Sequence, residues 1–181
     1  MKNKILTFAF MMLAQIATAQ KISEPEYIGQ VAIVNADSTI TVLPTEKTEI
    51  KTKSNGMFYI PVAGSLLGKC QTMMIVKGAT SQTTVPTSNV KLIVRVDDNN
   101  VDPHKKIGFV KFEVKKKERR FAMAEAGTLS GISQKIIYDD LSFKAVKIGT
   151  SSYLVTLDKI APGEYGLVEG EIMNIVTFKA K

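Results

Sequence analysis

Side chains suited to nucleophilic catalysis are scarce in this chain of 181 residues. His104 is the only histidine and Cys70 the only cysteine, so a Ser-His-Asp or Cys-His site would have to include His104. The glycine-bounded segment 127–131 (Gly-Thr-Leu-Ser-Gly) departs from the Gly-x-Ser-x-Gly pattern of a nucleophile elbow. One histidine and one cysteine are also too few ligands for zinc. We therefore expect no enzymatic activity and no cofactor.

Paired carboxylates are the next chemistry to consider, because glycosidases use two of them across a cleft. The visible pairs are Asp97-Asp98 and Asp139-Asp140. Adjacent residues of a strand point to opposite faces, so neither pair forms a catalytic dyad by itself. A polysaccharide hydrolase that combines carboxylates from distant positions stays open as an alternative.

Oxygen-bearing side chains also gather between residues 97 and 102, where five of six positions are Asp or Asn. Asp97, Asn99 and Asp102 are the candidate calcium ligands, since hard cations prefer oxygen. The EF-hand pattern fails, because its sixth position is Asp102 instead of Gly and its twelfth is Gly108 instead of Glu. A simple loop between strands is the alternative interpretation.

The densest charge in the chain is a basic run between residues 115 and 120, where five of six residues are cationic. Such a cluster can bind the phosphate or carboxylate groups of a glycan, and arginine adds bidentate hydrogen bonding. Alternatively, a lysine-rich edge strand or hairpin prevents other molecules from adding strands to the sheet. The candidate binding residues are Lys115, Lys116, Lys117, Arg119 and Arg120.

The N-terminus predicts export from the cytoplasm. Met1–Ala19 has two lysines, then an apolar stretch, then the small-x-small sequence Ala17-Thr18-Ala19 typical of a cleaved signal peptide. The apolar stretch is shorter than the roughly 20 residues of a membrane span. Cleavage would leave 22 basic and 17 acidic residues, so the net charge would fall from +7 to +5. We expect a secreted or periplasmic protein that attracts anionic surfaces and has no nucleic acid partner.

The sequence that follows the predicted signal peptide indicates an all-β fold. Short segments of alternating apolar and polar residues recur about every ten residues, separated by Gly, Pro, Asn and Asp, as in a sandwich or barrel. Ser54-Asn55-Gly56 predicts a turn. The polar stretch 80–89 is the best candidate boundary, which gives a β-rich part at 20–89 and a β-sandwich at 90–181. The two parts are either separate units or halves of one domain.

One local pattern resembles a known family. Leu157 to Tyr165 reads Leu-Asp-Lys-Ile-Ala-Pro-Gly-Glu-Tyr, similar to the tyrosine corner of immunoglobulin-like and fibronectin type III sandwiches. The resemblance implies structural roles for Pro162, Gly163 and Tyr165, whose hydroxyl would bond to the backbone just upstream. It implies an immunoglobulin-like fold for 90–181 and no function. Paired cysteines and tryptophan are missing from the sequence. The whole chain also resembles small secreted proteins of Gram-negative anaerobes.

By elimination, we expect a non-catalytic binding or structural module of the cell envelope that contacts an anionic glycan or a protein partner. A self-assembling surface subunit is a further alternative, since exposed strand edges can accept strands from neighbouring molecules.

Overall fold

The computed structural model describes residues 23–60, 65–127, 131–133, 141–169 and 174–181. The predicted signal peptide and the Asp139-Asp140 pair lie outside the described residues, as does the short apolar segment 135–138 that precedes this pair. The prediction of an all-β, antiparallel fold is confirmed, since two large sheets contain nearly all of the regular structure. The only helix among the described ranges is the short α2 (Pro103–Lys106), and none there is long and apolar enough to cross a membrane.

The first sheet has five antiparallel strands. Their spatial order is β10 (Lys144–Ile148), β11 (Ser152–Lys159), β6 (Ser88–Arg95), β1 (Val31–Val34) and β2 (Ile40–Val42). Both predicted parts of the chain contribute to this sheet, because β1 pairs with β6, placing Val31 opposite Val94.

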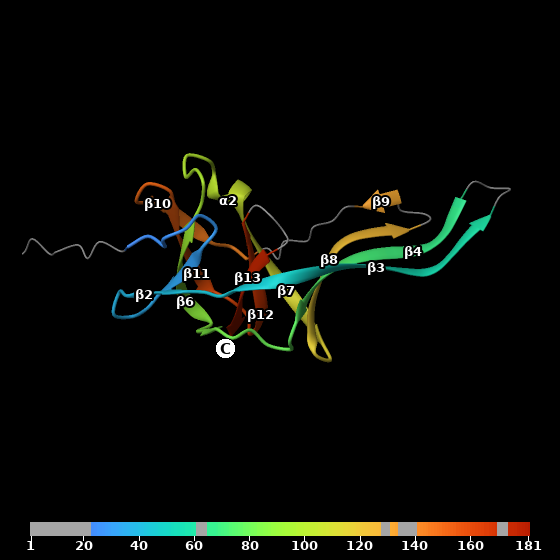
Figure 1. Cartoon of the computed structure of the whole chain (residues 1–181), viewed down its shortest axis with the longest axis horizontal. Helices are drawn as coiled ribbons and strands as arrows, with labels where there is room; N and C mark the ends of the chain where they lie inside the picture. Colours follow the sequence, from blue (N-terminus) through green and yellow to red (C-terminus); the bar gives the residue numbers. More distant parts are fainter. Residues whose placement is uncertain (1–22, 61–64, 128–130, 134–140, 170–173) are drawn as a thin grey trace, which may run out of the picture.

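The second sheet curls until it closes on itself. Its order is β12 (Gly163–Glu169), β7 (Ile107–Lys115), β8 (Glu118–Gly127), β4 (Ser65–Lys77), β3 (Thr45–Ile60), β13 (Asn174–Ala180) and β5 (Thr84–Val85), with β9 (Gly131–Ser133) beside β8. Because β12 also pairs with β13, six of these strands form a closed ring. The strands β3 and β4 run on beyond the ring as a long arm (Figure 1).

Two apolar cores result from this arrangement. The larger lies between the first sheet and the wall formed by β7, β12 and β13, and includes the alternating row Val90, Leu92, Val94 and Val96. The smaller fills the ring with Met74, Val76, Val110, Phe112, Phe121, Val168 and Ile175. Strands β12 and β13 and the first half of β7 therefore bury both of their faces.

The prediction of a turn at Ser54-Asn55-Gly56 is wrong. Strand β3 continues through it, and its pairing with β4 shifts register between Asn55 and Phe58. A bulge can accommodate a glycine and an unpaired residue without ending the strand, so turn-forming residues alone do not establish a turn. The polar stretch 80–89, the candidate boundary, contains β5 and the start of β6.

Candidate functional site

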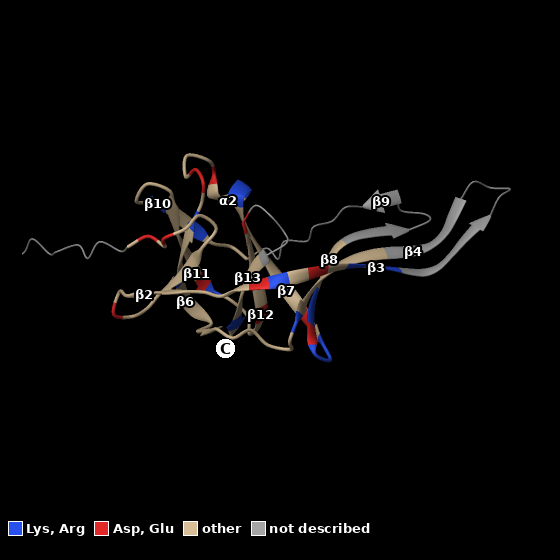
Figure 2. Cartoon of the chain, viewed as in Figure 1, with Lys and Arg blue, Asp and Glu red and all other residues tan. Residues whose placement is uncertain are grey.

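The basic run forms the tight hairpin between β7 and β8. Lys115 lies opposite Glu118 in the strand register, and Lys116 and Lys117 form the turn. Figure 2 shows the cationic residues at this end of the hairpin. We call Lys115, Lys116 and Lys117 the lysine tip. All three are exposed, and no ion pair joins any of them to another residue in the described part of the chain.

The two arginines of the basic run have different environments from the lysines. Arg119 is fully buried, with 0% of its surface exposed, so its guanidinium is not available to a ligand at the surface. Arg120 is mostly buried and donates to the Glu118 carboxylate, with Nη2 2.6 Å from Oε2. Of the five predicted binding residues, the three lysines of the lysine tip are therefore the exposed ones. The charge of Arg120 is neutralised by Glu118.

Arg119 holds the base of the hairpin through a complete set of hydrogen bonds. Its Nη2 donates to the Glu46 carboxylate at 2.6 Å and to the Lys77 carbonyl at 3.1 Å. Its Nη1 donates to the hydroxyls of Ser81 and Thr177, and its Nε to the Gly78 carbonyl. A guanidinium has five N–H donors, and all five are used here. Full satisfaction is what makes burial of such a charge tolerable.

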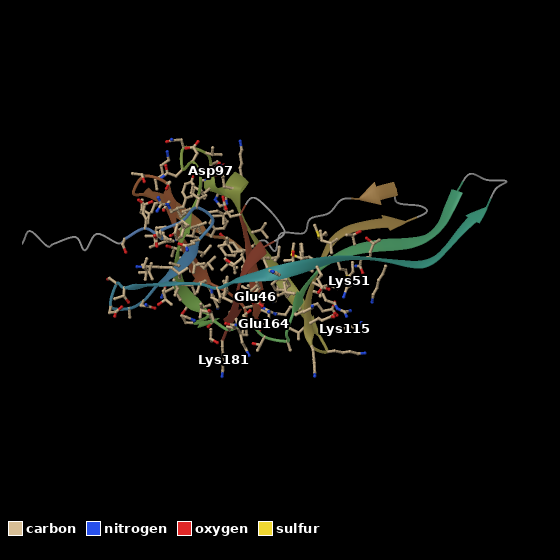
Figure 3. The ribbon with its side chains drawn as sticks, in the orientation of Figure 1. Glu46, Lys51, Asp97, Lys115, Glu164 and Lys181 are labelled. Carbon is tan, nitrogen blue, oxygen red and sulfur yellow. The ribbon has the colours of Figure 1, made fainter. Side chains whose placement is uncertain are left out.

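A second carboxylate extends this network to β12. Glu164 accepts hydrogen bonds from the Ser81 backbone N–H at 2.8 Å, the Ser81 hydroxyl at 2.6 Å and the Thr80 hydroxyl at 2.7 Å. Ser81 thus connects Glu164 to Arg119. Figure 3 shows Glu46 and Glu164 on the strands of the ring, with Lys115 farther out on the hairpin. No sequence pattern indicates this network, because its members other than Arg119 lie 38 or more positions away from that residue along the chain.

The turn of the hairpin is also fixed from outside. The Gly78 N–H donates to the Lys117 carbonyl at 2.8 Å, which joins the turn to the loop after β4. Lys116 has a φ of 57°, in the left-handed region that side chains other than Gly, Asn and Asp rarely adopt. The lysine tip therefore projects from a backbone that is held at both its base and its turn.

A groove of about 450 Å³ opens where β7 leaves β8. The two strands pair only from Glu113 and Arg120 to the turn, and before Glu113 β7 pairs with β12 instead. Side chains two apart in a strand share a face, so Lys111, Glu113 and Lys115 lie on one side of β7. The groove residues are Gln71, Met73, Lys111, Phe112, Glu113, Arg120, Phe121 and Ala122. Glu113, the last β7 residue of the groove, lies two positions before Lys115.

The predicted calcium ligands have other partners. Asp97 forms an ion pair with Lys106, and the Asp102 carboxylate accepts the His104 N–H at the start of α2. The Asn99 side-chain amide donates to the Ser152 carbonyl at 3.2 Å. Among the described residues, no group of three or more His, Cys, Asp or Glu side chains is placed to hold a metal ion. This arrangement matches the loop interpretation.

His104 is not placed beside a nucleophile by any observed hydrogen bond. Its ring lies 4.3 Å, centroid to centroid, from the ring of Phe143 on the exposed surface of α2. Cys70 belongs to a part of β4 whose side chains are outside the description. The absence of catalysis stays a prediction.

The tyrosine pattern forms the hydrogen bond expected of it. The Tyr165 hydroxyl donates to the Ala161 carbonyl at 2.9 Å, four residues upstream, and the ring is 1% exposed. A Cβ on Gly163 would lie 3.1 Å from the Lys111 Cε, a contact that a small shift of the flexible lysine side chain relieves. Pro162 precedes it at the bend between β11 and β12.

In comparisons with known proteins, no protein family, curated protein or solved structure matches the chain. The resemblance to immunoglobulin-like sandwiches therefore rests on the Tyr165 corner alone and stays a prediction.

Proposed function

We propose that this protein is a secreted or periplasmic, non-catalytic binding module of the cell envelope that contacts an anionic glycan through the lysine tip. The observation that carries the proposal is the exposure of three adjacent ammonium groups without ion-pair partners in the described chain, on a hairpin braced by the buried Arg119. A fixed backbone lowers the entropy lost when a ligand binds.

The groove beside β7 supports an extended ligand. Lys111 and Arg120 line it together with the apolar rings of Phe112 and Phe121. A polymer carrying repeated carboxylate or sulfate groups can contact the lysine tip with one unit and lie along the groove with the next. Long-range attraction by the cationic surface would also speed association and would weaken as salt is added.

Retention on immobilised polygalacturonate, with neutral dextran as reference, tests this function. The test variant replaces the lysine tip with glutamine, as Lys115→Gln, Lys116→Gln and Lys117→Gln in residues 20–181. The control removes the same charge from exposed lysines of the sandwich, as Lys91→Gln, Lys105→Gln and Lys159→Gln. We expect only the first variant to lose retention. Equal retention of both variants, or equal binding to dextran, would contradict the proposal.

A further inference from the structure

A second cavity, of about 680 Å³, lies at the other end of the sandwich from the lysine tip. It is enclosed by the segment before β1, the start of β3, the loop after β6, the end of α2 and the ends of β12 and β13. Its lining residue Glu169 lies opposite Ile107 at the start of β7, whereas Lys115 is at the end of that strand, and Figure 3 shows Asp97 and Lys115 well apart. The cavity is therefore separate from the site proposed above.

Part of the cavity wall is apolar, beside the polar and charged side chains of Gln30, Thr45, Asp97, Lys106 and Glu169. Val31, Leu167 and Val176 belong to the main core and line its inner side. Ile28 also lines the cavity and keeps 62% of its surface exposed, so an apolar group can contact it. These four apolar side chains suit a hydrocarbon stem.

Three charged side chains line the cavity, and only two of them are paired. Lys106, from α2, forms an ion pair with Asp97, whose Oδ1 also accepts the Asp98 N–H at 2.8 Å. Glu169, at the end of β12, has no hydrogen-bond or ion-pair partner among the described residues. Its Oε2 is near the backbone of Gly29, 3.7 Å from where a Cβ on that glycine would lie.

The surroundings of Glu169 disfavour its negative charge. Partial burial raises the pKa of the Glu169 carboxyl, and the Asp97 carboxylate raises it further, while Lys106 acts weakly in the opposite sense. A partly buried charge is normally paired. A cation entering the cavity would supply the missing partner and would also be attracted by Asp97.

The nature of that cation follows from the remaining ligands. Calcium takes six to eight oxygen ligands and usually several carboxylates, whereas no three-member group of His, Cys, Asp or Glu is found in the described chain. One free carboxylate beside apolar side chains instead matches an ammonium group on a hydrocarbon stem. The ammonium group would pair with the carboxylate, and the stem would pack against the apolar side chains.

We propose that this cavity binds a primary organic ammonium ion, with Glu169 as its counter-ion and Ile28, Leu167 and Val176 around its stem. The site does not depend on the lysine tip or on the anionic glycan.

Titration of residues 20–181 with hexylammonium chloride, followed by NMR, tests the proposal. Hexanol has the same stem without the charge, and calcium chloride has the charge without the stem. We expect hexylammonium to shift the signals of residues around the cavity and to bind at least about tenfold more tightly than hexanol. Equal affinity for hexanol, or displacement of hexylammonium by millimolar calcium, would overturn the proposal.

Two variants assign the interaction to Glu169. Glu169→Gln should weaken hexylammonium binding at least about tenfold, whereas the exposed Glu113→Gln should leave it unchanged. Asp97→Asn should also weaken it, because it releases Lys106 to compete for Glu169. Thermal unfolding shows whether each variant is folded. Unchanged affinity in folded Glu169→Gln would overturn the proposal, and the lysine-tip variant should bind hexylammonium like the wild type.

Discussion

Arg119 and Glu46 form an ion pair inside the protein, with the arginine Nη2 2.6 Å from the glutamate Oε2. Arg119 is on β8 and Glu46 on β3, and β4 lies between these strands in the sheet. The pair therefore connects two strands that share no backbone hydrogen bonds. The same guanidinium bonds to Thr177 on β13, so one side chain holds several strands of the ring around the base of the hairpin.

Replacing Arg119 with methionine should strongly destabilise the fold. The substitution leaves the Glu46 carboxylate, which is only 20% exposed, without its cation, and it removes donors from five acceptors. Breaking a largely buried pair in this way costs about 3–5 kcal/mol. Urea denaturation measures the loss in the free energy of unfolding. The matched change Arg120→Met removes a partly exposed pair and should cost at most about 1 kcal/mol. Similar losses for the two variants would show that the network contributes little.

Glu24 should make stability depend on pH. Its carboxylate accepts the Ser152 hydroxyl and the N–H groups of Thr150 and Ser151, and these bonds lower the pKa of Glu24 below its ordinary 4.5. The ionised form is thus favoured by folding. Its stabilisation is complete above about pH 4.5 and declines as pH falls through the lowered pKa.

Glu24→Gln should therefore have a lower urea midpoint than the wild type at pH 7 and a similar one near pH 2. Urea titrations of both proteins across this range provide the measurement. A difference that stays constant down to acid pH would mean that the charge of Glu24 is not the cause.

Gly166 should tolerate no larger residue. A Cβ there would lie 2.5 Å from the Ile175 Cδ1 and 3.0 Å from the Phe112 ring inside the closed ring. Gly166→Ala should cost about 1–3 kcal/mol in the free energy of unfolding, as overpacking a core does. Adding Ile175→Val removes the Cδ1 methyl, so the double variant should be more stable than the sum of the single effects predicts. Strict additivity would contradict this explanation.

Export should remove the first nineteen residues. Expression of the full chain in a Gram-negative host, followed by N-terminal sequencing of the protein outside the cytoplasm, should give Gln20 as the first residue. Replacing Ala17 and Ala19 with larger residues should block cleavage. An uncleaved cytoplasmic protein would contradict the predicted localisation.

Alternation of apolar residues was sufficient to predict the fold class and several of the strands. The Val90–Val96 row shows why, since burial of one face imposes a period of two on the sequence. The Tyr165 hydrogen bond was predictable because its acceptor is four residues away. The turn at Ser54–Gly56 was not correctly predicted, because the same residues also fit a bulge.

The candidate site was predictable only in part. The charge density of the hairpin is visible in the sequence, whereas the burial of Arg119 depends on Glu46, Ser81 and Thr177, which are brought together by folding alone. Periodicity cannot show which of two adjacent arginines will point into a closed ring. The cavity at Glu169 was not predictable for the same reason, because Ile28, Asp97 and Glu169 come from three segments that are distant in the sequence.

The most direct test of the lysine tip is the affinity of residues 20–181 for polygalacturonate at about 50 and 150 mM salt, since added salt screens exposed charges. We expect wild-type binding to weaken as salt is raised. The lysine-tip variant should bind about tenfold more weakly than the wild type at the lower salt concentration, with a smaller salt dependence. The Lys91, Lys105 and Lys159 control should retain wild-type affinity. Equal affinity and equal salt dependence of the two variants would contradict a specific role for the hairpin.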